Sequence, residues 1–181
     1  MIFTKRSAMP DLFLGLHPDN PSPATRVGVK LARIAPDLLG LTYSIFGDLA
    51  RVAFPAKQAA ARTDELWRHT CLEAFLAAEH GYYEFNFSPS SQWAAYRFTG
   101  YRADMREAPA YDPGIKWWLD GEAGRLSATV RLPMDLTGPL GLSTIIEDRN
   151  GNRSFWALAH PPGDPDFHHP ACFAAQLPPA G

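Results

Sequence analysis

Residues 82–98 read YYEFNFSPSSQWAAYRF, and this stretch decides the fold class. From Tyr82 to Ser88 the aromatic residues Tyr83, Phe85 and Phe87 alternate with a second set that includes the polar residues Glu84, Asn86 and Ser88. This is the period-two pattern of a β-strand whose two faces differ. The sequence Pro-Ser-Ser follows and favours a turn, and Trp93 to Phe98 then form the returning strand. Residues 82–98 therefore predict two paired antiparallel strands.

Strand patterns of the same kind recur along the chain. Further strands are predicted at residues 12–16, 27–32, 39–46, 49–54, 115–119, 126–132, 143–148 and 154–160. Gly47-Asp48 separates one pair of them, and Asn150-Gly151, which favours a type I′ turn, separates another, so two more hairpins are expected. About ten strands and few helices predict an all-β fold, an antiparallel β-sandwich of the jelly-roll or immunoglobulin-like kind.

The segment from Trp67 to Glu79 fits two structures. Thr70 and Glu73 have the spacing of a capping box, and the alanine-rich end of the segment favours a helix. The alternation of Cys71, Glu73 and Phe75 is equally consistent with a strand. The residues alone leave both interpretations open.

Composition and charge exclude several classes of partner. The chain has 181 residues, 46% of them hydrophobic and 20% charged, which suits one domain over residues 1–181. The formal net charge is −2 and the 17 Lys and Arg residues are scattered, so nucleic-acid binding is excluded. No apolar run is long enough to span a membrane, and no signal peptide is visible. The chain is therefore expected in the cytoplasm, with neither nucleic acid nor membrane as a partner.

Several segments resemble a known family. Residues 66–75, LWRHTCLEAF, resemble the LWxxTCxExF segment of bacterial DOMON-like proteins, which are related to family 9 carbohydrate-binding modules. Residues 84–96, EFNFSPSSQWAAY, look like their EFNxSPSGxWAxY segment, and YRADM at 101–105 stands where the family has YRxGM. The resemblance covers nearly the whole chain.

The resemblance implies a jelly-roll or immunoglobulin-like sandwich, related to modules that bind sugars or haem. It also implies that the segment from Trp67 to Glu79 is a strand. Ser91 and Asp104 stand where the family has glycine, which predicts slightly altered turns at these two positions. Because a fold does not define a function, the binding site is predicted from the residues themselves.

The polar face of the strand at 82–88 carries the first candidate binding residues. That face presents Tyr82, Glu84, Asn86 and Ser88, while Tyr83, Phe85 and Phe87 point to the other side. Sugar hydroxyls both donate and accept hydrogen bonds, so a row of acceptors suits them, and Trp93 is the expected stacking surface. The alternative is an ordinary solvated face with Trp93 in the core.

Arg102 and Trp67 are added to the predicted site. Arg102 is expected to pair with Glu84 or Glu73 and clamp a ligand, or else to form a structural salt bridge. Trp67, like Trp156, is either a ligand platform or a core anchor, and one of Trp117 and Trp118 is expected to be exposed. The predicted ligand-binding residues are thus Glu84, Asn86, Trp93, Arg102, Trp67 and Tyr82.

The sequence predicts no catalytic or metal-binding residues. Glu73 and Glu84 are conceivable as the carboxylate pair of a glycoside hydrolase, but nothing fixes their separation. Cys71 and His69 lack an orienting third group, and a buried free thiol is the simpler interpretation of both cysteines, Cys71 and Cys172. The candidate metal ligands match no zinc spacing; they are His160, His168, His169 and Asp166.

The predicted function is a non-catalytic binding module for a carbohydrate or another small polar ligand. One alternative is a haem- or metal-binding electron-transfer domain, for which Met105 or Met134 with a histidine would be the axial ligands of haem. The other is a protein-interaction domain whose exposed aromatic patch contacts a partner chain. The sequence identifies no cofactor, no particular ligand and no oligomeric state.

Overall fold

The structure is a computed structural model of the chain, and it describes residues 11–179. The signal-peptide prediction concerns residues 1–16, of which residues 1–10 lie outside this range. The predicted domain of residues 1–181 extends beyond the range at both ends. The strands are β1 (Leu12–Leu16), β2 (Ala24–Ala35), β3 (Leu38–Gly47), β4 (Cys71–Ala78), β5 (Tyr82–Phe87), β6 (Trp93–Phe98), β7 (Arg106–Glu107), β8 (Lys116–Leu119), β9 (Ala123–Arg131), β10 (Leu136–Glu147), β11 (Arg153–Ala157) and β12 (Ala175–Gln176). The short 3₁₀ turns are η1 (Leu49–Arg51), η2 (Leu66–Arg68) and η3 (Pro170–Cys172).

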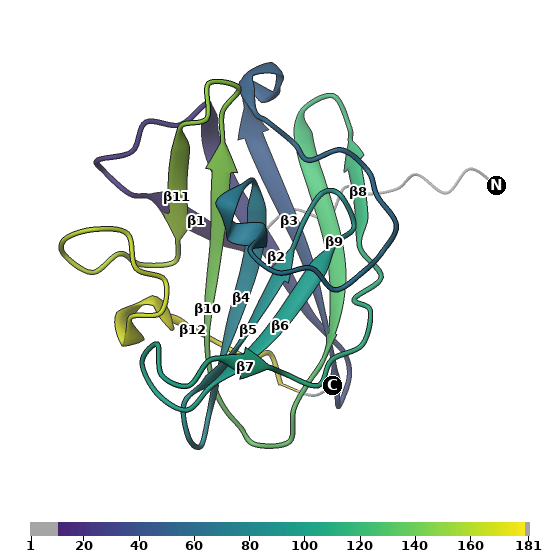
Figure 1. Cartoon of the computed structure of the whole chain (residues 1–181), viewed down its shortest axis with the longest axis vertical. Coiled ribbons are helices and arrows are strands. Elements are labelled where there is room, and N and C mark those ends of the chain that lie inside the picture. The colour runs from purple at the N-terminus through teal and green to yellow at the C-terminus, as the bar shows by residue number, and fades with distance from the viewer. Residues whose placement is uncertain (1–10, 180–181) are drawn as a thin grey trace.

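The strands form two layers joined through β1 (Figure 1). The first layer contains β2, β3, β9 and β8, and the second contains β11, β10, β4, β5, β6 and β7, with β12 beside β10. The first half of β1 pairs with β2 and its second half pairs with β11. All the strand pairs are antiparallel, so the predicted all-β antiparallel sandwich is confirmed.

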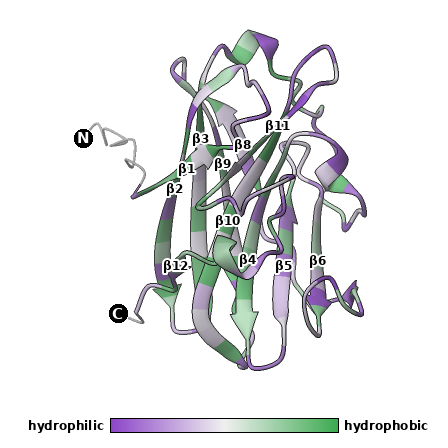
Figure 2. Cartoon of the chain, turned by 90° about the vertical axis from the view of Figure 1, so that its left-hand side faces the viewer, coloured by the Kyte–Doolittle hydropathy of each residue, from purple (hydrophilic) through white to green (hydrophobic). Residues whose placement is uncertain are grey.

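The main hydrophobic core lies between the two layers. Alternate residues of each strand point into it, including Val27 and Val29 of β2 and Leu72 and Leu76 of β4. In the side view of Figure 2, β2 and β6 lie on opposite sides of the molecule, and the hydrophobic stretches of the strands lie between them. Burial of these side chains supplies the main driving force for the sandwich.

A second hydrophobic cluster covers the outer face of the second layer. It contains Phe75 of β4, Tyr82 of β5 and Tyr96 and Phe98 of β6. Two segments outside the strands complete it, η2 through Leu66 and the loop after β11 through Phe167. The polar face of β5 is therefore buried beneath these segments, and the alternative of an ordinary solvated face is wrong.

The ambiguous segment after Trp67 contains a strand, as the family resemblance implied. Residues 66–68 form the turn η2, and β4 then pairs with β10 on one side and β5 on the other. Thr70 does not cap a helix, because its hydroxyl donates to the carbonyl of Ala53 at 2.8 Å and accepts from the amide of Glu147 at 3.1 Å. Pairing on both edges outweighs the local helix preference.

The two further hairpins have different outcomes. The hairpin predicted from 39–46 and 49–54 is wrong, because β2 and β9 already occupy the two edges of β3 and residues 49–51 form the turn η1. The hairpin across Asn150-Gly151 is confirmed, since β10 pairs with β11. Its turn is not type I′, which requires two positive φ angles, because Gly151 has a φ of +85° whereas Asn150 does not have a positive φ.

Two further predictions, that the cysteines are buried thiols and that one of Trp117 and Trp118 is exposed, are confirmed. Both cysteines are buried and free. Trp118 is exposed, whereas Trp117 packs on the ring of Phe54 with a centroid distance of 4.6 Å. None of the helices within residues 11–179 combines the length and the apolar composition that crossing a membrane requires.

The two positions where the family has glycine adopt the left-handed conformation. Ser91 has a φ of 80° and Asp104 a φ of 50°. Ser91 lies in the turn between β5 and β6, and its amide donates to the carbonyl of Ser88 at 3.0 Å. A residue with a Cβ adopts this conformation at a cost that glycine does not have.

Replacing Ser91 by glycine is therefore expected to stabilise the protein by about 1 kcal/mol. The substitution removes the left-handed penalty of about 1–2 kcal/mol, which exceeds the stability that is lost because glycine makes the unfolded chain more flexible. For a chain of this size the melting temperature should rise by about 2–4 °C in scanning calorimetry. Ser91→Ala is the control, since it also loses the hydroxyl that contacts Lys57 but keeps the Cβ. A glycine variant no more stable than the alanine variant would contradict the expectation.

Candidate functional site

The candidate site is a pocket on the outer face of the second layer. Its volume is about 340 Å³, and its walls come from β4, β5, β6, β10, β11, η2 and the loops that follow β6 and β11. The residues that line it are Trp67, Glu73, Glu84, Phe98, Arg102, Met105, Ile145, Phe155, Pro165, Phe167 and His168. Three of the six predicted site residues, Trp67, Glu84 and Arg102, thus meet in one pocket.

Two glutamates from adjacent strands lie in this pocket. Glu73 of β4 lies opposite Asn86 of β5, so Glu73 and Glu84 are diagonal neighbours on the same face. Both are buried, with exposed fractions of 2% for Glu73 and 5% for Glu84. The period-two alternation places them there, because their neighbours Leu72, Ala74 and Phe85 point into the main core.

Each glutamate accepts one side-chain hydrogen bond from the described residues. Asn86 Nδ2 donates to Glu84 Oε1 at 2.9 Å, and Ser143 Oγ of β10 donates to Glu73 Oε2 at 2.8 Å. Asn86 is fully buried, and its Oδ1 has no hydrogen-bond partner within residues 11–179. Asn86 is therefore a support for Glu84 and does not itself line the pocket.

Burial changes the protonation of both glutamates. It raises the pKa of Glu73 to about 8, and the negative charge of Glu84 adds to this effect. It also raises the pKa of Glu84 to about 7, although the hydrogen bond from Asn86 and the charge of Arg102 oppose the shift. The pair consequently retains a proton at neutral pH, so the pocket offers both hydroxyl donors and carboxylate acceptors.

His168 lies against the same pair. The Tyr82 hydroxyl lies 2.7 Å from His168 Nδ1, and His168 Nε2 lies 3.8 Å from Glu84 Oε2. The Tyr82 hydroxyl also accepts from the backbone amide of Arg102 at 3.2 Å, which leaves its proton for Nδ1 and assigns the ring proton to Nε2. Burial lowers the pKa of His168 to about 4, with the charge of Arg102 as a second cause, so the imidazole is neutral.

Arg102 has a different partner from the predicted one. Its Nη2 donates to Asp166 Oδ1 at 2.7 Å, and the Tyr101 hydroxyl donates to the other oxygen of Asp166. The pairing with Glu84 or Glu73 is therefore wrong, and the alternative of a structural salt bridge is confirmed, because the loop after β11 places Asp166 next to the guanidinium. Arg102 lines the pocket with its charge already paired.

The aromatic residues of the prediction divide between three environments. Trp67 is half-buried, contacts the ring of Tyr96 with a centroid distance of 5.9 Å and lines the pocket. Tyr82 is buried behind the pocket, where its hydroxyl holds His168. Trp156 is a core anchor, with its indole nitrogen donating to the Ser22 hydroxyl at 3.3 Å.

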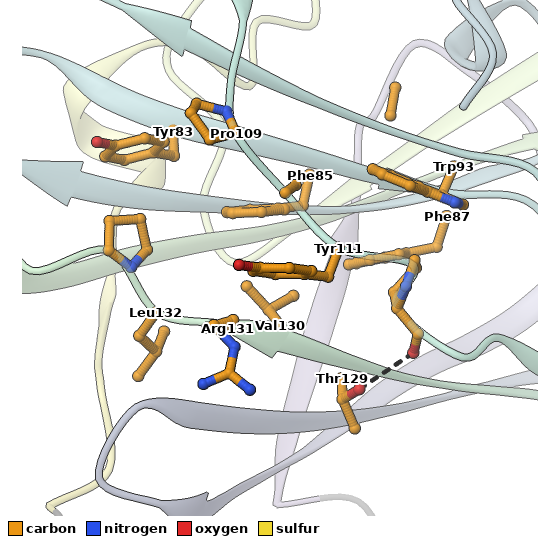
Figure 3. A pocket seen from close by; sticks show the side chains of 14 residues that line it. Tyr83, Phe85, Phe87, Trp93, Pro109, Tyr111, Thr129, Val130, Arg131 and Leu132 are labelled. Carbon is orange, nitrogen blue, oxygen red and sulfur yellow. Dashed lines mark hydrogen bonds between the residues drawn. The ribbon is translucent and has the colours of Figure 1, made fainter. Parts of the chain in front are cut away.

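Trp93 lies on the opposite face of the sheet, which corrects its predicted role beside Glu84. It pairs directly with Phe87, and residues directly opposite on antiparallel strands share a face, so it points into the main core. Arg62 covers its ring at 4.9 Å. Figure 3 shows Trp93 beside Phe87 in another cavity of about 240 Å³, between the two layers.

The haem and metal alternatives can be compared with these contacts. Met105 and His168 line the same pocket, but both ring nitrogens of His168 face groups of the protein, the Tyr82 hydroxyl and the Glu84 carboxyl. Met134 is fully exposed. Within residues 11–179, no three His, Cys, Asp or Glu side chains are grouped so as to share a metal ion.

Eight of the eleven residues that line the pocket were not among the predicted ligand-binding residues, and the polar ones of these eight are Glu73 and His168. The sequence pattern could have predicted Glu73, because its alternation with Cys71 and Phe75 places it on the face that Glu84 occupies on the paired strand. No spacing in the sequence pointed to His168, since it lies 84 positions after Glu84 and only the path of the loop after β11 brings the two together.

Comparison with known proteins gives the following results. No protein-family model and no curated protein sequence matches the chain. Two similar solved structures are carbohydrate-binding modules of family 9 from Caldicellulosiruptor kristjanssonii, one in complex with glucose and one with cellotriose. The module in the glucose complex is 13% identical to this chain with a TM-score of 0.43, and the match covers 83% of this chain and 76% of the module. The module in the cellotriose complex is 11% identical with a TM-score of 0.42, and the match covers 83% of this chain and 75% of the module.

Proposed function

We propose that the protein is a non-catalytic binding module and that the pocket at Glu73 and Glu84 binds a carbohydrate or a similar polyhydroxylated molecule. The observation that carries the proposal is the presence of two buried carboxyls in a pocket whose other walls include Trp67 and three phenylalanines. A sugar ring combines hydroxyl groups with flat C–H faces. The pocket offers a matching combination of polar and aromatic groups.

The polar groups suit hydroxyls in particular. The carboxyl pair holds a proton at neutral pH, so it donates as well as accepts, and the neutral imidazole of His168 adds a donor at Nε2. A ligand hydroxyl can therefore both donate and accept within a few ångströms. The volume of about 340 Å³ lies at the lower end of the range for small-molecule sites and fits a small ligand.

The arrangement of the glutamates favours binding over hydrolysis. Glycoside hydrolases place an acid and a second carboxylate on two sides of the bond that breaks. Glu73 and Glu84 instead point from adjacent strands in the same direction, so both approach a ligand from the floor of the pocket. This geometry supports hydrogen bonding to one side of a ligand.

Titration calorimetry tests the proposal, with glucose and cellotriose as the first probes and a wider panel of mono- and oligosaccharides after them. Trp67→Ala is expected to weaken binding at least about tenfold, because a sugar face loses its stacking partner. Trp118→Ala is the matched control, since Trp118 is exposed on the other layer. Absence of heat with every saccharide, or equal losses in both variants, would refute the proposal.

A further inference from the structure

The pocket contains a negative charge that the described residues do not balance. We propose that its preferred ligand carries a positively charged amine, as an amino sugar does, and that Glu73 and Glu84 bind the ammonium group. This inference rests on the proposed function and deepens it, since it concerns the same pocket. It is carried by the contacts of the two carboxyls, by the state of the nearby cations and by the aromatic walls.

Each carboxyl has an oxygen that is left for a ligand. The side-chain hydrogen bonds from residues 11–179 reach Oε1 of Glu84 and Oε2 of Glu73. The nearest basic atom to the other oxygen of Glu84 is His168 Nε2, at 3.8 Å, which is beyond hydrogen-bond distance. Glu73 Oε1 and Glu84 Oε2, on one floor of the pocket, therefore receive no side-chain hydrogen bond from this part of the chain. An ammonium group has three donors to offer them.

The basic groups around the pocket do not neutralise this pair. The guanidinium of Arg102, which lowers the pKa of Glu84, already has a carboxylate partner in Asp166. His168 is neutral because burial lowers its pKa to about 4. The other titratable side chains that interact with the two carboxyls are Tyr43, Cys71, Tyr82 and Tyr96. All four are neutral at pH 7, since the ordinary pKa values of tyrosine and cysteine lie above 7 and burial raises each pKa further.

The walls of the pocket also suit a cation. Trp67, Phe98, Phe155 and Phe167 line it, and the face of an aromatic ring attracts a positive charge. The attraction increases where water is excluded, and Glu73 and Glu84 are almost completely buried at this position. An uncharged hydroxyl would satisfy the carboxyl oxygens but would not use the net charge of the pair.

A cationic ligand should displace protons from the pair. Burial raises the pKa values of Glu73 and Glu84 to about 8 and about 7, so the free pocket is partly protonated at neutral pH. An ammonium group beside them favours the ionised forms and lowers both pKa values. An amine that is already protonated in solution should therefore release protons from the pair when it binds, and its binding should strengthen as the pH rises from about 6 to about 7, whereas binding of an uncharged sugar should not.

The decisive experiment is calorimetric titration of the full chain with glucose, 2-amino-2-deoxyglucose, 6-amino-6-deoxyglucose and the N-acetylated form of each amine. At least one amine is expected to bind about tenfold or more tightly than glucose, which corresponds to about 1.4 kcal/mol. The N-acetyl forms keep the nitrogen but lose its charge, so they should not share the advantage. Titration in buffers of different ionisation enthalpy should show proton release for the amine alone.

Variants of single glutamates locate the effect. Glu84→Gln should remove the preference of the amine over glucose, and Glu79→Gln, which removes an exposed carboxylate at the end of β4, should leave it unchanged. Glu73→Gln provides a second variant should Glu84→Gln fail to fold. In either folded pocket variant, the affinity for the amine should fall to about the affinity for glucose.

Each result has a distinct meaning. Tighter binding of an amine with proton release, lost in the pocket variants, supports the inference. Binding of glucose as tight as that of both amines overturns the inference and leaves the proposed function standing. Absence of binding for all of these ligands and for the wider saccharide panel overturns both. A preference that survives in both pocket variants also overturns the inference, because the amine then binds elsewhere.

Discussion

Glu73→Gln is expected to raise the melting temperature of the protein at about pH 8.5 by several degrees and to flatten the decline of stability between pH 6.5 and 8. Burial raises the pKa of Glu73 from its ordinary value of 4.5 to about 8 in the folded protein. Between these two pH values the folded state holds a proton that the unfolded state has lost. The free energy of unfolding therefore decreases as the pH rises through this window.

Two other groups shape the same profile. Glu84, whose pKa burial raises from 4.5 to about 7, adds a decrease in stability between those values. His168 acts oppositely, because its pKa falls from 6.5 to about 4 on folding, so stability increases with pH between 4 and 6.5. The contributions partly cancel below pH 6.5, and above it the decrease caused by the carboxyls remains. Glutamine lacks the titration but can still accept the hydrogen bond from Ser143.

Thermal unfolding followed by circular dichroism from about pH 6 to about pH 9 measures this effect. The wild type should lose stability as the pH rises from about 6.5 to about 8, and Glu73→Gln should lose less. Glu79→Gln serves as the comparison, because the same substitution at an exposed position should give a profile parallel to that of the wild type. A parallel profile for Glu73→Gln would show that Glu73 is not protonated in the folded protein.

The alternation around Phe85 predicted which side chains of β5 share a face, and the structure places them so. Glu84 and Asn86 point away from the main core, as expected from the period of an extended chain. The same argument failed for Trp93, because its face depends on the register between β5 and β6. That register is fixed by contacts of the turn, such as the amide of Ser88 donating to the carbonyl of Gln92 at 2.9 Å, which the sequence pattern does not encode.

Contacts between distant segments could not be predicted either. Arg102 and Asp166 are 64 residues apart, and their ion pair depends on the path of the loop after β11. Burial of Glu84 has the same origin, since η2 and that loop cover the outer face. A period-two pattern indicates that a face is different from the core face, but whether loops cover it is decided by tertiary packing.

The turn that joins the two glutamate strands provides the second large expected effect. Gly81 lies between β4 and β5 with a φ of +85°, and its carbonyl accepts from the amide of Ala78 at 3.0 Å. A Cβ at Gly81 would lie 2.0 Å from the carbonyl oxygen of Phe98 on the neighbouring strand β6. Because that atom belongs to the backbone, Gly81→Ala requires β5 and β6 to move apart.

Gly151 is a matched control for this substitution. It also has a φ of +85° and lies in a hairpin turn, but a Cβ there would meet nothing within 4 Å. Gly151→Ala should therefore cost only the left-handed penalty of about 1–2 kcal/mol. Gly81→Ala should cost this penalty and the clash, about 4 kcal/mol or more in total, with a fall in melting temperature of about 10 °C or complete loss of folding.

The difference between the two variants also bears on the pocket. Gly81→Ala disturbs the strands that position Glu73 and Glu84, whereas Gly151→Ala changes a turn between β10 and β11. If Gly81→Ala folds, it should bind saccharides more weakly than Gly151→Ala in the same titration, because a shift of β5 moves a carboxyl away from its partner. Equal melting temperatures for the two variants in scanning calorimetry would refute the close approach of β6 to the turn. They would also refute the rigid spacing of β5 and β6, on which the floor of the pocket depends.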